Sequence, residues 1–150
     1  MRQWVWACVL TASLLAGAGC LGVADTSGDC TGELVPNATA EEPTLSPGES
    51  TTLRVEAENV SRMQLRLPET EEVEFELTDA SHSPSLGGQM DSYPPIWLWG
   101  ECTDVETTVP VSAAADAEPG TYNYSVRAWF YHDNSTVGVD ERFNVTVAGA

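Results

Sequence analysis

Cys30, Cys102, His82 and His132 are the side chains of this 150-residue chain best suited to redox or metal chemistry. A mononuclear copper site needs one Cys, two His and usually a Met, with one His and the Met a few residues after the Cys. Here His82 precedes Cys102, His132 follows it by thirty residues, and both candidate methionines lie upstream. The spacing does not fit copper, and we predict no metal site and no cofactor.

Catalytic chemistry has equally little support. We expect both histidines in solvated loops, and no Ser, His and Asp occur in a motif that would assemble a triad. The 23 acidic residues are too common for any pair of them to indicate catalysis. Several loop aspartates could hold Ca²⁺, but no ligand spacing recurs. We therefore predict that the chain is not an enzyme.

The N-terminal residues have the build of a secretory leader. Arg2 is the only charge before Asp25, an apolar run follows it, and small residues lead to Cys20. Leu14, Leu15, then Ala18-Gly19-Cys20 resembles the lipobox of prokaryotic lipoproteins. That resemblance implies cleavage of residues 1–19 and a lipid on Cys20, which would anchor the chain to a membrane and face it outward.

Two other interpretations of the leader stay open. Residues 4–24 contain no charge and are long enough to cross a bilayer uncut. A plain signal cut near Ala18 would leave Cys20 without a role. All three interpretations place the rest of the chain outside the cytoplasm, where two thiols in one small domain most often pair. We therefore expect a Cys30–Cys102 disulfide.

The charge balance is extreme. Six Lys+Arg, all of them Arg, face 23 Asp+Glu, and the formal net charge is −17. Such a lysine-free, carboxylate-rich surface resembles secreted proteins of halophilic archaea, where molar salt screens like charges within about 3 Å. Nucleic acid is a poor partner for it.

After a Ser/Thr/Pro-rich tether, assigned to residues 20–44, alternation of apolar and polar residues predicts strands. The predicted strands are 52–58, 62–67, 72–77, 96–99, 105–111, 121–131 and 137–147. Arg54, Arg62 and Arg66 are expected to pair across strands with glutamates. Residues 78–95 are expected to form a long loop, Pro110 an edge or bulge, and Glu141 a bulge or a place where its strand passes the sheet edge.

About seven short antiparallel strands predict an all-β sandwich over residues 45–150. Leu45-Ser46-Pro47-Gly48-Glu49 and Glu118-Pro119-Gly120-Thr121-Tyr122 resemble strand entries in immunoglobulin-like domains of prokaryotic surface proteins. The resemblance implies that the Tyr122 hydroxyl forms a corner by bonding a preceding backbone carbonyl.

Two further features concern the surface. Tyr93, Trp97 and Trp99 flank a Pro-Pro pair and could form an exposed rim that recognises protein or carbohydrate, although one or both tryptophans could equally be core residues. Five Asn-X-Ser/Thr sequons suggest glycosylation, at Asn37, Asn59, Asn123, Asn134 and Asn144.

These features together predict a non-catalytic cell-surface lipoprotein, an envelope, adhesion or spacer module. Its partners would be the membrane, through the lipid, and another envelope protein or a glycan. The alternative is an accessory lipoprotein that presents a sugar, peptide or metal to a membrane system. The 131 residues left after cleavage are too few for the two lobes of a large solute-binding protein, which favours the first function.

Overall fold

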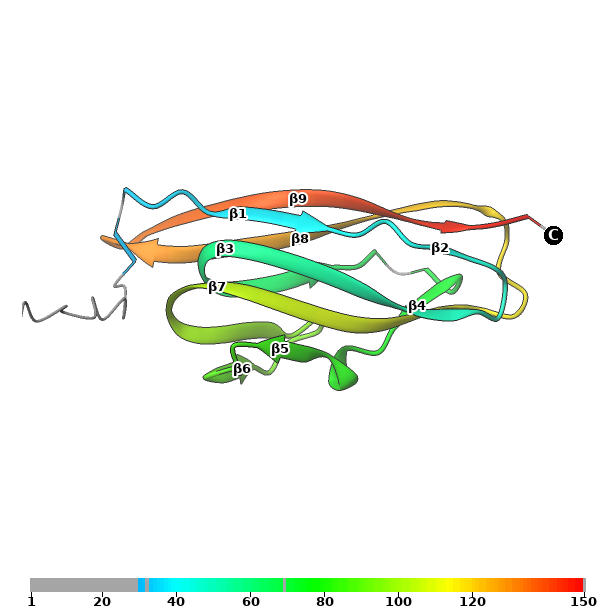
Figure 1. The fold of residues 1–150 in the computed structure, drawn as a ribbon, viewed down its shortest axis with the longest axis horizontal. Helices are drawn as coiled ribbons and strands as arrows, with labels where there is room; N and C mark the ends of the chain where they lie inside the picture. The colour runs from blue at the N-terminus through cyan, green and yellow to red at the C-terminus, as the bar shows by residue number, and fades with distance from the viewer. Residues whose placement is uncertain (1–29, 32, 69, 150) are drawn as a thin grey trace, which may run out of the picture.

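The computed structural model describes residues 30, 31, 33–68 and 70–149. The leader and the predicted lipid site at Cys20 lie outside these residues. The described chain forms nine strands and one short 3₁₀ helix, η1 (Figure 1). Their bounds are β1 (Asn37–Ala40), β2 (Thr44–Leu45), β3 (Ser50–Arg66), β4 (Val73–Phe75), η1 (Leu77–Asp79), β5 (Ser81–Ser83), β6 (Gly88–Met90), β7 (Ile96–Ala113), β8 (Gly120–His132) and β9 (Ser135–Val147).

Two long strands, β3 and β7, pair along most of their lengths and bend together at one end of the molecule (Figure 1). The pairing slips between Ala57 and Val60 and again before Arg62, and the bend is made with positive φ at Asn59 (56°) on β3 and at Gly100 (82°) on β7. Bulges of this kind let a strand leave one sheet and continue in another. β3 and β7 therefore each contribute to both layers of a β-sandwich.

The partners of each half define the layers. In the first layer, the first half of β3 and the second half of β7 pair with β1, β4 and β5. In the second layer, the second half of β3 pairs with β8, which pairs with β9, and β9 holds β2 in parallel. The first half of β7 carries β6 on this side. The predicted all-β sandwich is confirmed, and it is antiparallel except at β2.

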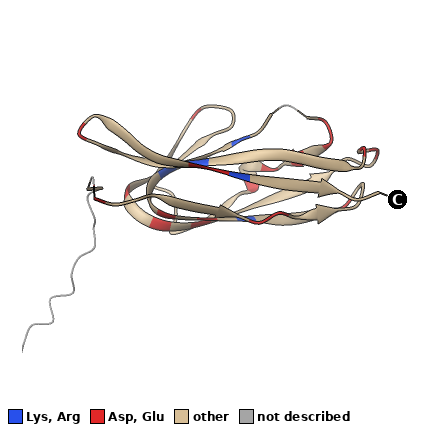
Figure 2. Cartoon of the chain, turned by 90° about the horizontal axis from the view of Figure 1, so that it is seen from above, with Lys and Arg blue, Asp and Glu red and all other residues tan. Residues whose placement is uncertain are grey.

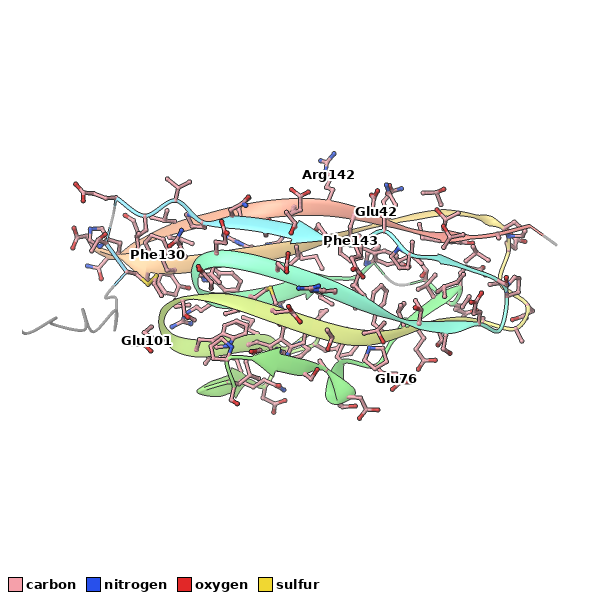
Figure 3. The ribbon with its side chains drawn as sticks, viewed as in Figure 1. Glu42, Glu76, Glu101, Phe130, Arg142 and Phe143 are labelled. Atoms are coloured by element: carbon pink, nitrogen blue, oxygen red, sulfur yellow. A yellow bond between two sulfur atoms is a disulfide. The ribbon has the colours of Figure 1, made fainter. Side chains whose placement is uncertain are left out.

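The core fills the space between the layers, because each strand buries alternate residues. Its largest fully buried side chains come from β2, β3, β7, β8 and β9 and include Trp97, Phe130, Phe143, Leu45 and Met63. Phe75, Tyr124 and Phe143 form an aromatic group with ring centroids 4.9 to 6.5 Å apart. Figure 3 shows the alternation on β9, where Phe143 lies between the layers and Arg142 projects away from them.

Two turns lead into β8 and out of it, and both are defined in atomic detail. Asp133 and Asn134, with φ of 47° and 61°, connect β8 to β9 in a two-residue hairpin. Positive φ at both positions is what a type I′ turn requires. Tyr122 Oη donates a 2.7 Å hydrogen bond to the carbonyl of Glu118, the corner that the immunoglobulin-like resemblance implied.

The sandwich begins earlier than residue 45. β1 pairs with β3 and lies inside the segment assigned to a tether, and β2, which pairs with β9, begins at the last residue of that segment, Thr44. The segments predicted as separate strands at 52–58 and 62–67 are one bent strand, as are those at 96–99 and 105–111. A bulge, rather than a turn sequence, makes each bend, and a bulge leaves little trace in the residue pattern.

Residues 78–95 are not a plain loop, since they contain part of η1 and the strands β5 and β6. Both strands add their backbones to β7 with mostly exposed side chains, which gives no apolar alternation. Pro110 lies within β7, between the residues that pair with β5 and those that pair with β4. The missing N–H costs nothing there, while the Pro110 carbonyl accepts from the Glu76 N–H at 3.0 Å.

Glu141 marks no bulge, because the β8–β9 register is continuous from Gly120 and Val147 to His132 and Ser135. β2 pairs with β9 only at Thr146 and Val147. At Glu141, which is half-buried, β9 therefore has no paired strand on its outer side. This agrees with the second prediction for Glu141, that its strand passes the edge of the sheet there.

Candidate functional site

The Cys30–Cys102 disulfide closes one end of the sandwich, and the predicted pairing is confirmed. The two Cα atoms are 5.1 Å apart, within the usual range for a disulfide. Cys102 lies just past Gly100, at the bend of β7. The disulfide therefore fixes the first described residue to the point where β3 and β7 change layers.

Hydrogen bonds hold the same N-terminal segment in place. His132 Nδ1 donates to the carbonyl of Cys30 at 3.0 Å, and Asn59 Nδ2 donates to the carbonyl of Val35 at 3.2 Å. His132 ends β8 instead of lying free in a loop, and its Nε2 is 3.1 Å from a carboxylate oxygen of Asp133. The disulfide and these hydrogen bonds therefore fix the end of the sandwich where the described chain begins.

The expected aromatic rim does not form, because Trp97 and Trp99 are core residues exposed by only 1% and 7%. Both point inward from the first half of β7, where the second layer needs large side chains. Trp99 Nε1 donates to the carbonyl of Pro84 at 2.9 Å. Tyr93, exposed by 85%, is the one member of the predicted rim that faces solvent.

His82 packs on these tryptophans rather than lying in a solvated loop. Its ring centroid is 4.7 Å from that of Trp97 and 5.8 Å from that of Trp99, and its Nδ1 is 2.9 Å from the buried hydroxyl of Thr107. Burial lowers the pKa of His82, because desolvation disfavours the charged imidazole. The arrangement therefore disfavours the charged form of His82 within the fold.

The five sequons divide into two groups. Asn37, Asn123 and Asn134 are exposed. Asn59 is half-buried with its amide nitrogen bonded to Val35, and Asn144 donates its amide nitrogen to Glu42 Oε1 at 2.9 Å. Only the first group presents a side-chain nitrogen that no described hydrogen bond occupies.

Two shallow grooves adjoin, one on the second layer and the other between that layer and β4 of the first layer. The first, of about 540 Å³, is bordered by Gln64, Arg66, Pro94, Ser125 and Arg142. The second, of about 530 Å³, contains Tyr93 and shares Leu67, Pro68 and Tyr124 with the first. The grooves are open to solvent.

Arginine placement is the feature that reasoning from the sequence missed. Figure 2 shows acidic segments along strands and turns and only a few basic ones. Arg54, on the first layer, pairs with Glu56 and Glu106 at 2.6 Å each, as expected. Arg62 instead lies 4.6 Å over the ring of Tyr131, and Arg66 reaches no described carboxylate closer than Asp140 at 3.9 Å.

The described residues include no group of three or more His, Cys, Asp or Glu side chains placed to hold a metal ion. The described part of the chain also has no helix that is long and apolar enough to cross a membrane.

Several solved structures are similar to this chain. A protein of Corynebacterium diphtheriae described as membrane-anchored matches with a TM-score of 0.53 at 12% identity, over 81% of this chain and 38% of that one. A non-cellulosomal cohesin from Archaeoglobus fulgidus matches at 0.44 and 12% identity, over 75% of this chain and 92% of that one.

A family 123 glycoside hydrolase from Clostridium perfringens matches at 0.40 and 10% identity, over 76% of this chain and 27% of that one. At 12% identity the match to the Corynebacterium diphtheriae protein shows the fold alone, and folds host many functions. The other two, with TM-scores below 0.5, support no argument. No family model and no curated protein sequence matches the chain.

Proposed function

We propose that this chain is a non-catalytic module displayed on the outside of a cell and held to the membrane by a lipid on Cys20. The observation that carries the proposal is the Cys30–Cys102 disulfide. Disulfides persist in oxidising compartments outside the cytoplasm, which fits a leader that ends in a lipobox-like Ala18-Gly19-Cys20.

The position of the disulfide also suits an anchored module. Nine residues separate Cys20 from Cys30, and nine residues span at most about 30 Å when fully extended. In this proposal the end of the sandwich with the disulfide faces the membrane at short range. The opposite end, and the long sides of the sandwich, remain open to other envelope components.

Mass spectrometry of the membrane-bound protein tests the anchor. The wild-type chain should begin at Cys20 and carry the mass of an attached lipid. Cys20→Ser should keep its leader and lose the lipid mass. Cys8→Ser is the matched control, because Cys8 leaves with the leader, and it should behave as wild type. A Cys20→Ser protein that partitions into detergent like wild type, without lipid and without an uncut leader, would refute the proposal.

We also propose that glycans occupy Asn37, Asn123 and Asn134 rather than Asn59 and Asn144. The exposed amides of the first three and the hydrogen-bonded amides of the other two support this division. Glycopeptide analysis of protein from its native envelope should find sugar on members of the first group. Glycans found only on Asn59 or Asn144 would contradict it.

The acidic composition favours the further proposal that the protein works at high salt concentration. A formal charge of −17 repels itself, and added salt screens that repulsion. Thermal melts from low to molar KCl should shift steadily upward. A flat series would remove this part of the proposal.

A further inference from the structure

Four of the five described arginines project from one side of the molecule, the outer side of the β3–β8–β9 layer. Arg66 on β3 and Arg142 on β9 lie directly across from Ser125 on β8, one on each side. Neighbouring strands are about 4.8 Å apart, so roughly 10 Å separates the backbones of these two arginines.

The other two arginines continue the pattern along the strands. Two residues further along β8, Arg127 lies between Gln64 and Asp140, and two beyond that Trp129 lies between Arg62 and Gly138. Each step is about 7 Å along the strand. We call Arg62, Arg66, Arg127 and Arg142 the arginine face.

These guanidinium groups are poorly paired for a protein with 23 acidic residues. Arg62 and Arg127 lie over the rings of Tyr131 and Trp129, at 4.6 and 5.4 Å. Arg66 has Asp140 at 3.9 Å. Arg142 has no carboxylate within 4.0 Å among the described residues. By contrast, Arg54 on the opposite layer holds two carboxylates at 2.6 Å.

The composition of this side is that of a protein interface. Arg, Trp, Tyr and Met are enriched where proteins meet, and Asp and Glu are depleted. Of the outward strand positions on β3, β8 and β9 in this layer, Asp140 is the only acid. Tyr131 and Met90, at its borders, are exposed by 51% and 45%.

We propose that the arginine face is the docking surface for an acidic segment of a partner protein. Guanidinium groups bind carboxylates with paired, charge-assisted hydrogen bonds. Arg66 and Arg142 border the 540 Å³ groove together with Ser125 and Gln64, which gives one carboxylate a defined seat. The remaining arginines extend the charge along the path that the next acids of an extended segment would follow.

The same contacts disfavour two other occupants. A sugar polymer needs open ring faces, but guanidinium groups lie over Tyr131, and Trp129 is only 6% exposed. A second copy of this chain would bring its full charge of −17, whereas a short segment brings only the charges that the arginines neutralise.

This inference rests on the proposed function, and a binding assay separates the two. The probe is a fluorescein-labelled peptide in which Glu alternates with Ser, titrated by anisotropy with full-length protein in detergent. Arg66→Ser and Arg142→Ser should each weaken binding about tenfold, since a charge-assisted hydrogen bond contributes at least that much. Arg54→Ser removes the same charge from the opposite layer and should bind as wild type does.

Several results would overturn the docking surface. These are no binding of the acidic peptide, equal weakening by Arg54→Ser, equal binding of polygalacturonate through the same arginines, or self-association in sedimentation that the same variants abolish. Thermal melts confirm that each variant is folded. Lipid on Cys20 with no peptide binding would refute the docking surface alone, whereas absence of the lipid would refute the anchor and leave the binding result standing.

Discussion

The hydroxyl of Tyr122 donates a 2.7 Å hydrogen bond to the carbonyl of Glu118, four residues earlier in the chain. This bond fixes the turn that leads into β8, whose pairing with both β3 and β9 makes it a central strand of the second layer.

Tyr122→Phe should lower the free energy of unfolding, because it removes the bond and keeps the ring. Urea unfolding with an unchanged m-value measures this loss. Tyr131→Phe is the matched control, since no described hydrogen bond uses its hydroxyl, and it should be close to neutral. Equal effects of the two changes would show that the corner contributes nothing.

Gly138→Ala should destabilise the protein by about 1–3 kcal/mol. A Cβ at this position would lie 2.7 Å from Trp129 Cβ and 2.9 Å from the carbonyl oxygen of Ala128, and neither atom can move without the backbone of β8. Gly149→Ala, where an added Cβ meets nothing within 4 Å, serves as the control. Chemical denaturation compares them, and a neutral Gly138→Ala would mean that the two strands separate easily there.

Replacing both Cys30 and Cys102 by Ser should cost on the order of 4 kcal/mol in the chain-entropy model, because the bond closes a loop between residues 72 apart. Thermal or urea unfolding under non-reducing conditions measures the loss. Alkylation before mass spectrometry should label neither thiol in the wild-type protein, and two labelled thiols there would show that the bond is absent in solution.

His82 should make stability depend on pH near neutrality. Its pKa is lowered from 6.5 in the folded protein by desolvation, so the unfolded chain takes up a proton more readily. The contribution of neutral His82 is present above pH 6.5 and is lost as the pH falls below that value. His82→Gln should flatten this part of the stability curve measured by urea unfolding between about pH 5 and 8. Identical curves for variant and wild type would exclude His82 as the source.

Strand identity could be read from the sequence where one face of a strand is buried. Residues 121–131 and 137–147 alternate apolar and polar side chains, and both segments lie in strands. The short strands β1, β5 and β6 escaped notice, since three or four mostly exposed residues that pair through their backbones leave no apolar period. The bends of β3 and β7 also depend on pairing across the fold rather than on local turn residues.

The candidate site divides in the same way. The disulfide was predictable because only two cysteines remain after the presumed lipid site, and chemistry alone suggests their pairing. The arginine face was not, because Arg66 and Arg142 become neighbours only through the order of β3, β8 and β9. The outward positions of separate strands hold the signal, but topology decides which of them share a surface.

The Cys30–Cys102 disulfide also determines how the sandwich would respond to pulling. Suppose that the chain is tethered through Cys20 and held near its last strand, β9. Tension then passes from Cys30 through the disulfide to Cys102, at the bend of β7, and does not run along β1 or β2. Residues 31–101 lie inside a covalent ring and cannot be drawn out, so among the described residues only those after Cys102 can lengthen. β8 and β9, paired along thirteen residues each, would have to separate before the module extended.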